Sequence, residues 1–191
     1  RVDNMLKLTS DLRKASLDMR LVDPTVPAEV ANGKLTAVAD HVYAKYKETS
    51  DKKGTQLVFC DLSTPKGASD KVSESESDVE EKDEAEEQDN ITAYEQIRDM
   101  LVKQGIPSNE IAFIHDAKNQ AQKAELFEKV RNGDIRVLIG STEKMGAGTN
   151  IQTRLVALHH VDAPWRPRDI EQREGRILRQ GNMNKEVEVF N

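Results

Sequence analysis

Residues 111–139, IAFIHDAKNQAQKAELFEKVRNGDIRVLI, contain the pattern that decides the fold. The two ends of this stretch, 111–114 and 135–139, are short apolar runs with the length and composition of buried strands. The stretch between them, 119–131, has the length and spacing of a helix. A strand, a helix and a second strand joined by short polar turns favour a parallel strand pair with the helix packed across it.

The same alternation continues on both sides of this unit. Further strands are expected at 57–60, 155–158 and 187–189, and further helices at 3–21, 34–47, 91–104 and 168–178. This order predicts an α/β domain with three layers, in which helices cover both faces of a mainly parallel sheet. Ligands of such folds bind at the carboxyl ends of the strands, so the loops 141–150 and 162–168 are candidate site loops.

The composition limits the classes of protein to which the chain can belong. Its 191 residues suffice for one domain, and 37% hydrophobic but only 4% aromatic residues suit an aliphatic core. The single cysteine, Cys60, excludes an internal disulfide and is expected to lie buried in a strand. His159 and His160 would point to opposite faces of a strand, so we expect no metal site. No apolar run could span a bilayer, which predicts a cytoplasmic protein without a membrane partner.

Residues 63–90 differ sharply in composition from the rest of the chain. Within them, 70–89 hold eleven Asp or Glu and two Lys, a net charge of −9, whereas the whole chain carries −6. We expect a disordered acidic insertion because the segment has almost nothing to bury. It is either a plain solvated loop or an acidic mimic of nucleic acid. The difference leaves +3 on the remaining residues, a balance that permits binding to DNA or RNA.

Two segments near the end of the chain carry the residues that indicate chemistry: 141–150, STEKMGAGTN, and 172–181, QREGRILRQG. In the second segment Arg173, Arg176 and Arg179 recur every three residues, so a helix would place them on one cationic ridge. A guanidinium stays charged and presents forked donors that match phosphate oxygens, which suits a triphosphate. The alternative is a solvated basic helix face.

Together these segments resemble motifs V and VI of the C-terminal RecA-like lobe of superfamily-two helicases. They are most similar to those of Swi/Snf-type ATP-dependent translocases. Residues 162–167, DAPWRP, resemble the family's connection between the two motifs. Their sequence is most similar to the corresponding segment of large helicase-type proteins of bacteria, phages and mobile elements. The resemblance implies that 1–191 form one helicase C-terminal domain, with 1–33 as a helical lead-in.

The resemblance also assigns roles to individual residues. It implies catalytic arginine fingers that approach the γ-phosphate, contacts to ATP, and contacts to the nucleic-acid backbone. The residues concerned are Arg176 and Arg179 for catalysis, Gly148, Asn150, Gln172 and Arg173 for ATP, and Ser141 and Thr142 for nucleic acid. For Asn150, the alternative is a residue that only caps a turn.

The chain lacks other parts that such a motor needs. No Gly-x-x-x-x-Gly-Lys-Ser/Thr segment occurs, and the acids that follow apolar runs, Asp61 and Asp162, precede no Glu and are interpreted as ordinary strand ends. The resemblance therefore implies that ATP and Mg²⁺ are bound mainly by a preceding RecA-like lobe absent from this chain, and that the isolated piece is inactive. We expect half of an ATP-driven motor on double-stranded DNA. The alternatives are an RNA motor and a degenerate scaffold lobe that binds DNA or protein.

Overall fold

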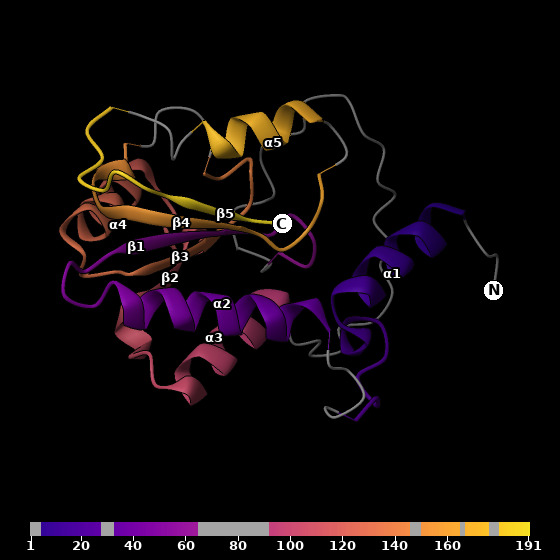
Figure 1. The fold of residues 1–191 in the computed structure, drawn as a ribbon. Helices are drawn as coiled ribbons and strands as arrows, with labels where there is room; N and C mark the ends of the chain where they lie inside the picture. Colours follow the sequence, from indigo (N-terminus) through magenta and orange to yellow (C-terminus); the bar gives the residue numbers. More distant parts are fainter. Residues whose placement is uncertain (1–4, 28–32, 65–91, 146–149, 165–166, 176–179) are drawn as a thin grey trace.

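The computed structural model describes residues 5–27, 33–64, 92–145, 150–164, 167–175 and 180–191 (Figure 1). Five strands form one sheet in the order β2-β3-β1-β4-β5, and each neighbouring pair is parallel. The strands are β1 (Thr55–Phe59), β2 (Ile111–Phe113), β3 (Val137–Gly140), β4 (Leu155–His160) and β5 (Glu188–Phe190). The parallel sheet that the sequence predicts is thereby confirmed.

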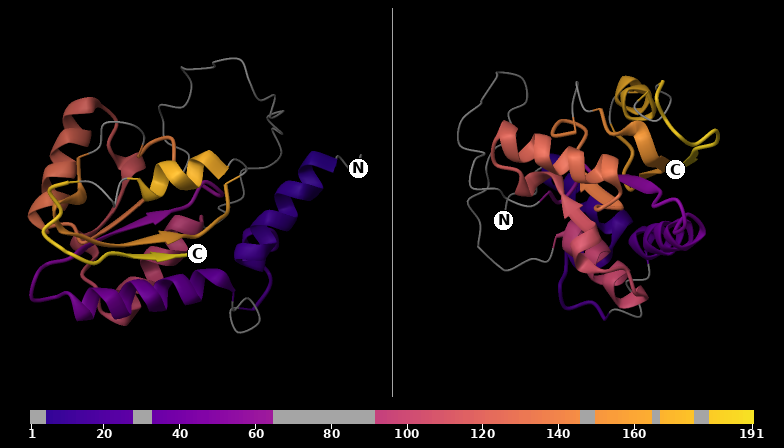
Figure 2. Two further views of the ribbon diagram at one scale, coloured as in Figure 1. Left: turned by 45° about the horizontal axis from the view of Figure 1, so that its top comes forward. Right: turned by 90° about the vertical axis from the view of Figure 1, so that its left-hand side faces the viewer.

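Helices cover both faces of this sheet. The α-helices are α1 (Met5–Leu17), α2 (Lys34–Glu48), α3 (Ala93–Gln104), α4 (Gln120–Asn132) and α5 (Pro167–Glu174). Helices α2 and α3 lie on one face, whereas α4 and α5 lie on the other (Figures 1 and 2). Single 3₁₀ turns occur at Met19–Leu21, Ser108–Glu110, Ile114–Asp116 and Gln152–Arg154. The arrangement has three layers, α/β/α, as expected.

Alternate residues of the central strand β1 point into the two halves of the core. Leu57 and Phe59 pack with Phe127 and Val130 of α4, whereas Val58 packs among residues of α2 and α3. Every residue of β1 is buried. A strand that is covered on both faces gives a continuous apolar run, which explains why this strand could be recognised from the sequence.

Short-range hydrogen bonds set the ends of α3 and α4. The α3 N-terminus has a capping box, in which Thr92 accepts from the backbone of Glu95 and the Glu95 carboxylate accepts from the backbone of Thr92. Asn119 caps α4 through its side-chain oxygen. Gly133 ends α4 at a φ of +78°, and a Cβ there would lie 2.8 Å from the Cβ of Lys53, so glycine is required.

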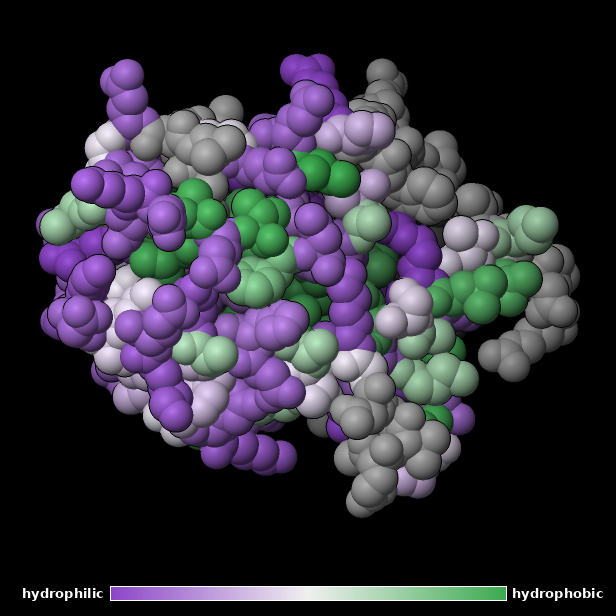
Figure 3. Space-filling view, in the orientation of Figure 1, coloured by the Kyte–Doolittle hydropathy of each residue, from purple (hydrophilic) through white to green (hydrophobic). Residues whose placement is uncertain are grey.

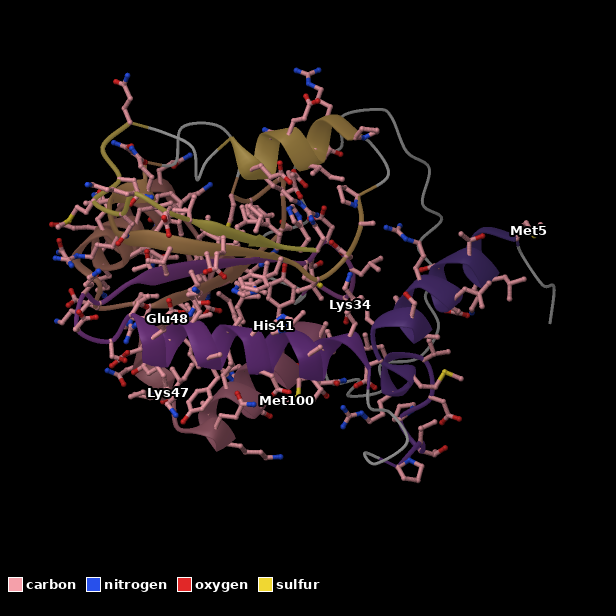
Figure 4. All side chains as sticks on the ribbon, viewed as in Figure 1. Met5, Lys34, His41, Lys47, Glu48 and Met100 are labelled. Atoms are coloured by element: carbon pink, nitrogen blue, oxygen red, sulfur yellow. The ribbon has the colours of Figure 1, made fainter. Side chains whose placement is uncertain are left out.

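The edge strand β5 is held against α2 by side chains. The Phe190 ring stacks 4.8 Å from the ring of His159 and lies 5.0 Å from the ring of His41, measured between centroids. Glu188 forms an ion pair with Lys45 of α2. Figure 4 labels His41 on α2, on the opposite face of the sheet from α5. These contacts place the last strand of the chain beside β4.

Helix α1 extends away from the sheet at one side of the molecule (Figures 1 and 2). The predicted helix 3–21 is interrupted because Asp18 accepts a hydrogen bond from the backbone N–H of Arg20 and caps a separate 3₁₀ turn. Met5, Leu8 and Leu12 on α1 are exposed, and hydrophobic surface gathers over this helix in Figure 3. None of the described helices is both long and apolar enough to cross a lipid bilayer.

Most predicted elements agree with the structure to within about two residues. The largest differences are in two helices: α1 ends at Leu17 where the sequence predicts a helix to residue 21, and the described part of the predicted helix 168–178 forms α5, which ends at Glu174. Strand β4 extends two residues beyond the predicted 155–158 and so includes His159 and His160. Residues 65–91, which hold nearly all of the predicted acidic insertion, lie outside the described residues. The disorder of 63–90 and the assignment of 1–191 to one domain with a lead-in at 1–33 stay predictions.

Candidate nucleotide and nucleic-acid site

The carboxyl ends of three neighbouring strands meet at one edge of the sheet. In the register of the sheet, Phe59 at the end of β1 lies between Gly140 of β3 and His160 of β4. The chain therefore places Asp61, Thr142 and Asp162 side by side just beyond these strand ends. Helix α5 packs above the same edge, as Figure 2 shows.

Arg173 of α5 is the centre of this edge. Its side chain is 0% exposed, and its five N–H groups all have acceptors. Nε donates to Thr142 Oγ1 at 2.7 Å, Nη1 donates to His160 Nδ1 and to the Asp162 carbonyl at 3.1 Å each, and Nη2 donates to Asp61 Oδ2 at 2.6 Å and to Asp162 Oδ1 at 3.1 Å. One guanidinium thereby joins α5 to the ends of β1, β3 and β4.

The two carboxylates have further partners of their own. Asp61 Oδ1 accepts from the Thr142 backbone N–H at 2.6 Å, and Asp61 Oδ2 accepts from the Thr142 hydroxyl at 2.8 Å. Asp162 Oδ2 accepts from the backbone N–H groups of Asp61 and Leu62 at 2.6 and 2.7 Å. A buried charge is tolerated only when it is paired and hydrogen-bonded, and both conditions hold for Arg173 and Asp162.

His160 is kept neutral beside this guanidinium. Burial, and then the charge of Arg173, lower its pKa to about 4. Because Nδ1 accepts the Arg173 bond, the ring proton is assigned to Nε2, which lies 3.7 Å from a carboxylate oxygen of Glu174. His159 points to the other face of β4 and meets Gln56 at 2.9 Å, as expected for adjacent strand residues. Burial lowers its pKa to about 3.

The end of β1 is also fixed from the opposite face of the sheet. Tyr94 of α3 donates to the Cys60 carbonyl at 2.6 Å, and Cys60 Sγ donates to the Leu62 carbonyl at 3.0 Å. Cys60 is buried, as predicted, but it lies just after β1, which ends at Phe59, and burial raises the pKa of its thiol well above the usual range. A thiol in this state is a structural group and a poor nucleophile.

The structure brings some of the predicted site residues together and separates others. Thr142 and Arg173 are in direct contact. Ser141 is buried, and its hydroxyl accepts from the backbone N–H of Lys144 at 3.3 Å. Gln172 is exposed on α5. Asn150 is exposed and lies against α4, where its carbonyl accepts from Arg131 at 3.1 Å.

Three of the predicted residues, Gly148, Arg176 and Arg179, lie outside the described residues. Arg173, the first arginine of the predicted cationic ridge, is buried and every one of its donors is engaged within the protein, whereas the ridge itself stays a prediction. Its predicted contact with ATP stays a prediction, and such a contact would require one of the present bonds to open.

Sequence reasoning missed three residues of this cluster: Asp61, Asp162 and His160. The available signal was that two of the expected parallel strands are each followed by an acid, while the nearby segment 172–181 holds an arginine. We compared these acids only with a magnesium site and, because neither precedes a Glu, interpreted them as ordinary strand ends. Among the residues that the structure describes, no group of three or more His, Cys, Asp or Glu could hold a metal ion.

The fold and the position of the cluster define a RecA-like α/β domain. A family model described as the helicase conserved C-terminal domain matches residues 77–181, which is more than half of the chain. The chain therefore belongs to the helicase conserved C-terminal domain family. No curated protein sequence matches it.

Solved structures with a similar fold include several helicases. The DUF1998 helicase MrfA bound to DNA and AMPPNP has a TM-score of 0.50 and 17% identity, over 86% of this chain and 18% of that chain. The C-terminal part of the Fun30 ATPase domain has a TM-score of 0.48 and 18% identity, over 79% and 39% of the two chains. The Hef helicase domain of Pyrococcus furiosus has a TM-score of 0.45 and 13% identity, over 84% and 25%. The chain thus spans less than half the length of each of these structures.

Proposed function

We propose that this chain is the C-terminal half of an ATP-dependent DNA helicase or translocase of the Swi/Snf type. Its task is to supply the arginine fingers Arg176 and Arg179 to ATP that is bound mainly by a preceding RecA-like lobe. The observation that carries this proposal is the attachment of α5, which leads into the segment 176–179, to the carboxyl edge of the sheet through Arg173. This edge is where ligands bind in parallel α/β folds.

The residues present suit a secondary role in nucleotide binding. ATP and Mg²⁺ supply the transferable phosphoryl group and the cation that neutralises its oxygens. From this chain, Gln172 and Asn150 are exposed and available for polar contacts with the nucleotide, and Gly148 is proposed beside them. We assign Arg173 the task of holding α5 in place, because all of its donors are used within the protein.

Ser141 and Thr142 are the proposed contacts to the nucleic-acid backbone. Both lie directly after β3 at the same edge of the sheet, and Thr142 is partly exposed. Backbone contacts of this kind position a protein on its track without reading sequence. We propose duplex DNA as the track, and DNA is present in the MrfA complex described above, which has a similar fold. Closing and reopening of two lobes around ATP would then move the protein along the strand.

The test uses the full-length protein that carries this chain. ATP turnover is measured with and without duplex DNA for the wild type, Arg176→Ala, Arg179→Ala and the control Arg98→Ala, which removes a surface arginine of α3. We expect turnover to fall on the order of 1,000-fold or more in the two finger variants, because a finger stabilises charge in the transition state. The control should retain wild-type turnover.

Two results would contradict the proposal. Unchanged turnover in Arg179→Ala would favour a scaffold lobe that keeps the fold without the catalysis. Stronger stimulation by duplex RNA than by duplex DNA would favour an RNA motor.

A further inference from the structure

We propose that Asp61 is a positioning residue that couples the loop 141–145 to helix α5, so that contact with nucleic acid is transmitted to the arginine fingers. This inference rests on the proposed function and deepens it. Asp61 belongs to neither the 141–150 nor the 172–181 segment. It lies beyond the end of β1, between the two segments in space.

The coupling is visible as a triangle of hydrogen bonds. Asp61 accepts from both the backbone N–H and the hydroxyl of Thr142, and its Oδ2 also accepts from Arg173 Nη2. The third side is closed by the bond from Arg173 Nε to the Thr142 hydroxyl at 2.7 Å. Charge-assisted bonds of 2.6 to 2.8 Å are the short and strong class, so the three groups move as a unit.

Asp61 differs from Asp162, the second carboxylate of the cluster. The Asp162 side chain is 2% exposed and binds the backbone at residues 61 and 62 as well as Arg173, which fixes the end of β1. The Asp61 side chain is 33% exposed. It is the carboxylate that contacts Thr142 and Arg173 together, at the border of the cluster with solvent. Asp162 therefore fixes the end of β1, whereas Asp61 connects the loop 141–145 to helix α5.

The hydrogen bonds between Thr142 and Asp61 have a consequence for the proposed motor. A nucleic-acid phosphate that shifts Thr142 changes both bonds from Thr142 to Asp61 and also the acceptor of Arg173 Nε. Because Arg173 lies on α5, the shift reaches the segment that carries Arg176 and Arg179. We therefore expect stimulation of ATP turnover by DNA to depend on Asp61.

The first experiment compares Asp61→Asn with the control Asp99→Asn in the full-length protein. Asparagine keeps the size of the side chain but turns one acceptor into a donor, which faces either the Thr142 backbone N–H or both the Thr142 hydroxyl and Arg173 Nη2. The measured quantity is the ratio of turnover with saturating duplex DNA to turnover without it. We expect this ratio to fall about tenfold in Asp61→Asn, the usual effect of losing a hydrogen bond to a charged group. The control, on the exposed side of α3, should keep the wild-type ratio. An unchanged ratio in Asp61→Asn overturns the inference.

A double-mutant cycle separates coupling from general weakening. Thr142→Val removes the hydroxyl that contacts both Asp61 and Arg173, and it is measured alone and combined with Asp61→Asn. If the two residues act as one unit, the double variant should lose no more stimulation than the stronger single variant. Losses that multiply would show independent roles and contradict the coupling.

A readout that does not depend on ATP turnover keeps the two proposals apart. Hydrogen exchange is followed in peptides that cover 141–145 and 167–174, with and without duplex DNA. In the wild type, DNA should slow exchange in both peptides, whereas in Asp61→Asn the response of 167–174 should disappear. A wild type whose turnover ignores DNA would refute the proposed function. In that case hydrogen exchange in the DNA-free protein still tests the coupling through Asp61. Asp61→Asn should speed exchange in both peptides, and unchanged exchange in 167–174 would contradict the coupling.

Discussion

Two buried arginines stand at opposite edges of the same sheet, and they differ in their partners. Arg173, at the carboxyl edge, binds two carboxylates as well as neutral groups. Arg136, at the start of β3, is 4% exposed and binds only neutral acceptors among the described residues, the carbonyls of Gly54 and Tyr46 at 3.0 and 2.9 Å and two hydroxyls. Its guanidinium also lies 4.0 Å from the centroid of the Tyr46 ring.

This difference in partners distinguishes an arginine that only joins elements of the fold from one that lies in the candidate functional site. Arg136 joins the last turn of α2 to the beginnings of β1 and β3, where the helix dipole already favours a cation and no further charge is needed. Burial lowers its pKa. Arg173 has charged partners, Asp61 and Asp162, that lie just beyond β1 and β4, at the same edge of the sheet as the proposed ligand contacts Ser141 and Thr142. Arg136, with its neutral partners, joins elements of the fold, whereas Arg173 with its carboxylate partners belongs to the cluster that we propose to couple the loop 141–145 to α5.

The largest effect is expected when Arg173 is replaced. Arg173→Met keeps the length of the side chain but leaves Asp61 and Asp162 without their cation, so the free energy of unfolding should fall by about 3–5 kcal/mol. Urea denaturation measures this value. Adding Asp162→Asn to Arg173→Met should recover part of the loss, since it removes the unpaired buried charge. A further loss in that double variant would contradict the ion-pair account.

Sequence alone could predict the frame around both arginines but not their burial. The strands and helices follow from local apolar spacing, so 57–60 and 119–131 were placed within about two residues of β1 and α4. The environment of Arg173 depends on Asp61, which is 112 residues away in the chain, and on Asp162. A repeat of three arginines looks the same whether its first member faces solvent or two carboxylates. Such long-range pairs require the fold.

The cap at Asp18 shows the same limit on a smaller scale. Apolar residues continue at helical spacing through Leu21, so the sequence predicts one helix over 3–21. The Asp18 side chain competes for the backbone N–H of Arg20 and ends the helix before it. In the candidate site, the sequence predicted that the loops after the strands at 135–139 and 155–158 lie at one edge, because the carboxyl ends of parallel strands meet there, and Thr142 and Asp162 do lie at that edge.

A smaller effect is expected at the other edge of the sheet. Arg136→Met removes bonds to neutral acceptors and leaves no unpaired charge, so the free energy of unfolding should fall by about 1–3 kcal/mol. The same urea experiment measures it. A loss equal to that of Arg173→Met would break the comparison, because it would mean that carboxylate partners add nothing to the dependence on a buried arginine.

The smallest effect is a pH dependence that belongs to the Arg173 side. The pKa of His160 is about 4 in the folded protein, below its ordinary value of 6.5. Between these two values the unfolded chain binds a proton that the folded chain does not, so stability is lost as the pH falls through this window. Arg173 and Lys34 oppose a charge on the ring, whereas Glu174 at 3.7 Å favours it. From pH 6.5 to 5 we expect His160 to contribute a loss of about 1–2 kcal/mol.

His160→Asn isolates this contribution, because its side-chain oxygen can still accept the bond from Arg173 while the group no longer titrates. The free energy of unfolding is measured by urea denaturation at several pH values between 5 and 7. The variant should lose less stability than the wild type over this interval, although not all of the dependence disappears, since burial also lowers the pKa of His159, to about 3. His41→Gln, which replaces an exposed histidine on α2, serves as the comparison variant: because the charge of His41 also lowers the pKa of His159, we expect it to change the dependence, but less than His160→Asn does. If His160→Asn kept the wild-type dependence, a neutral ring beside Arg173 would be the wrong account of this edge.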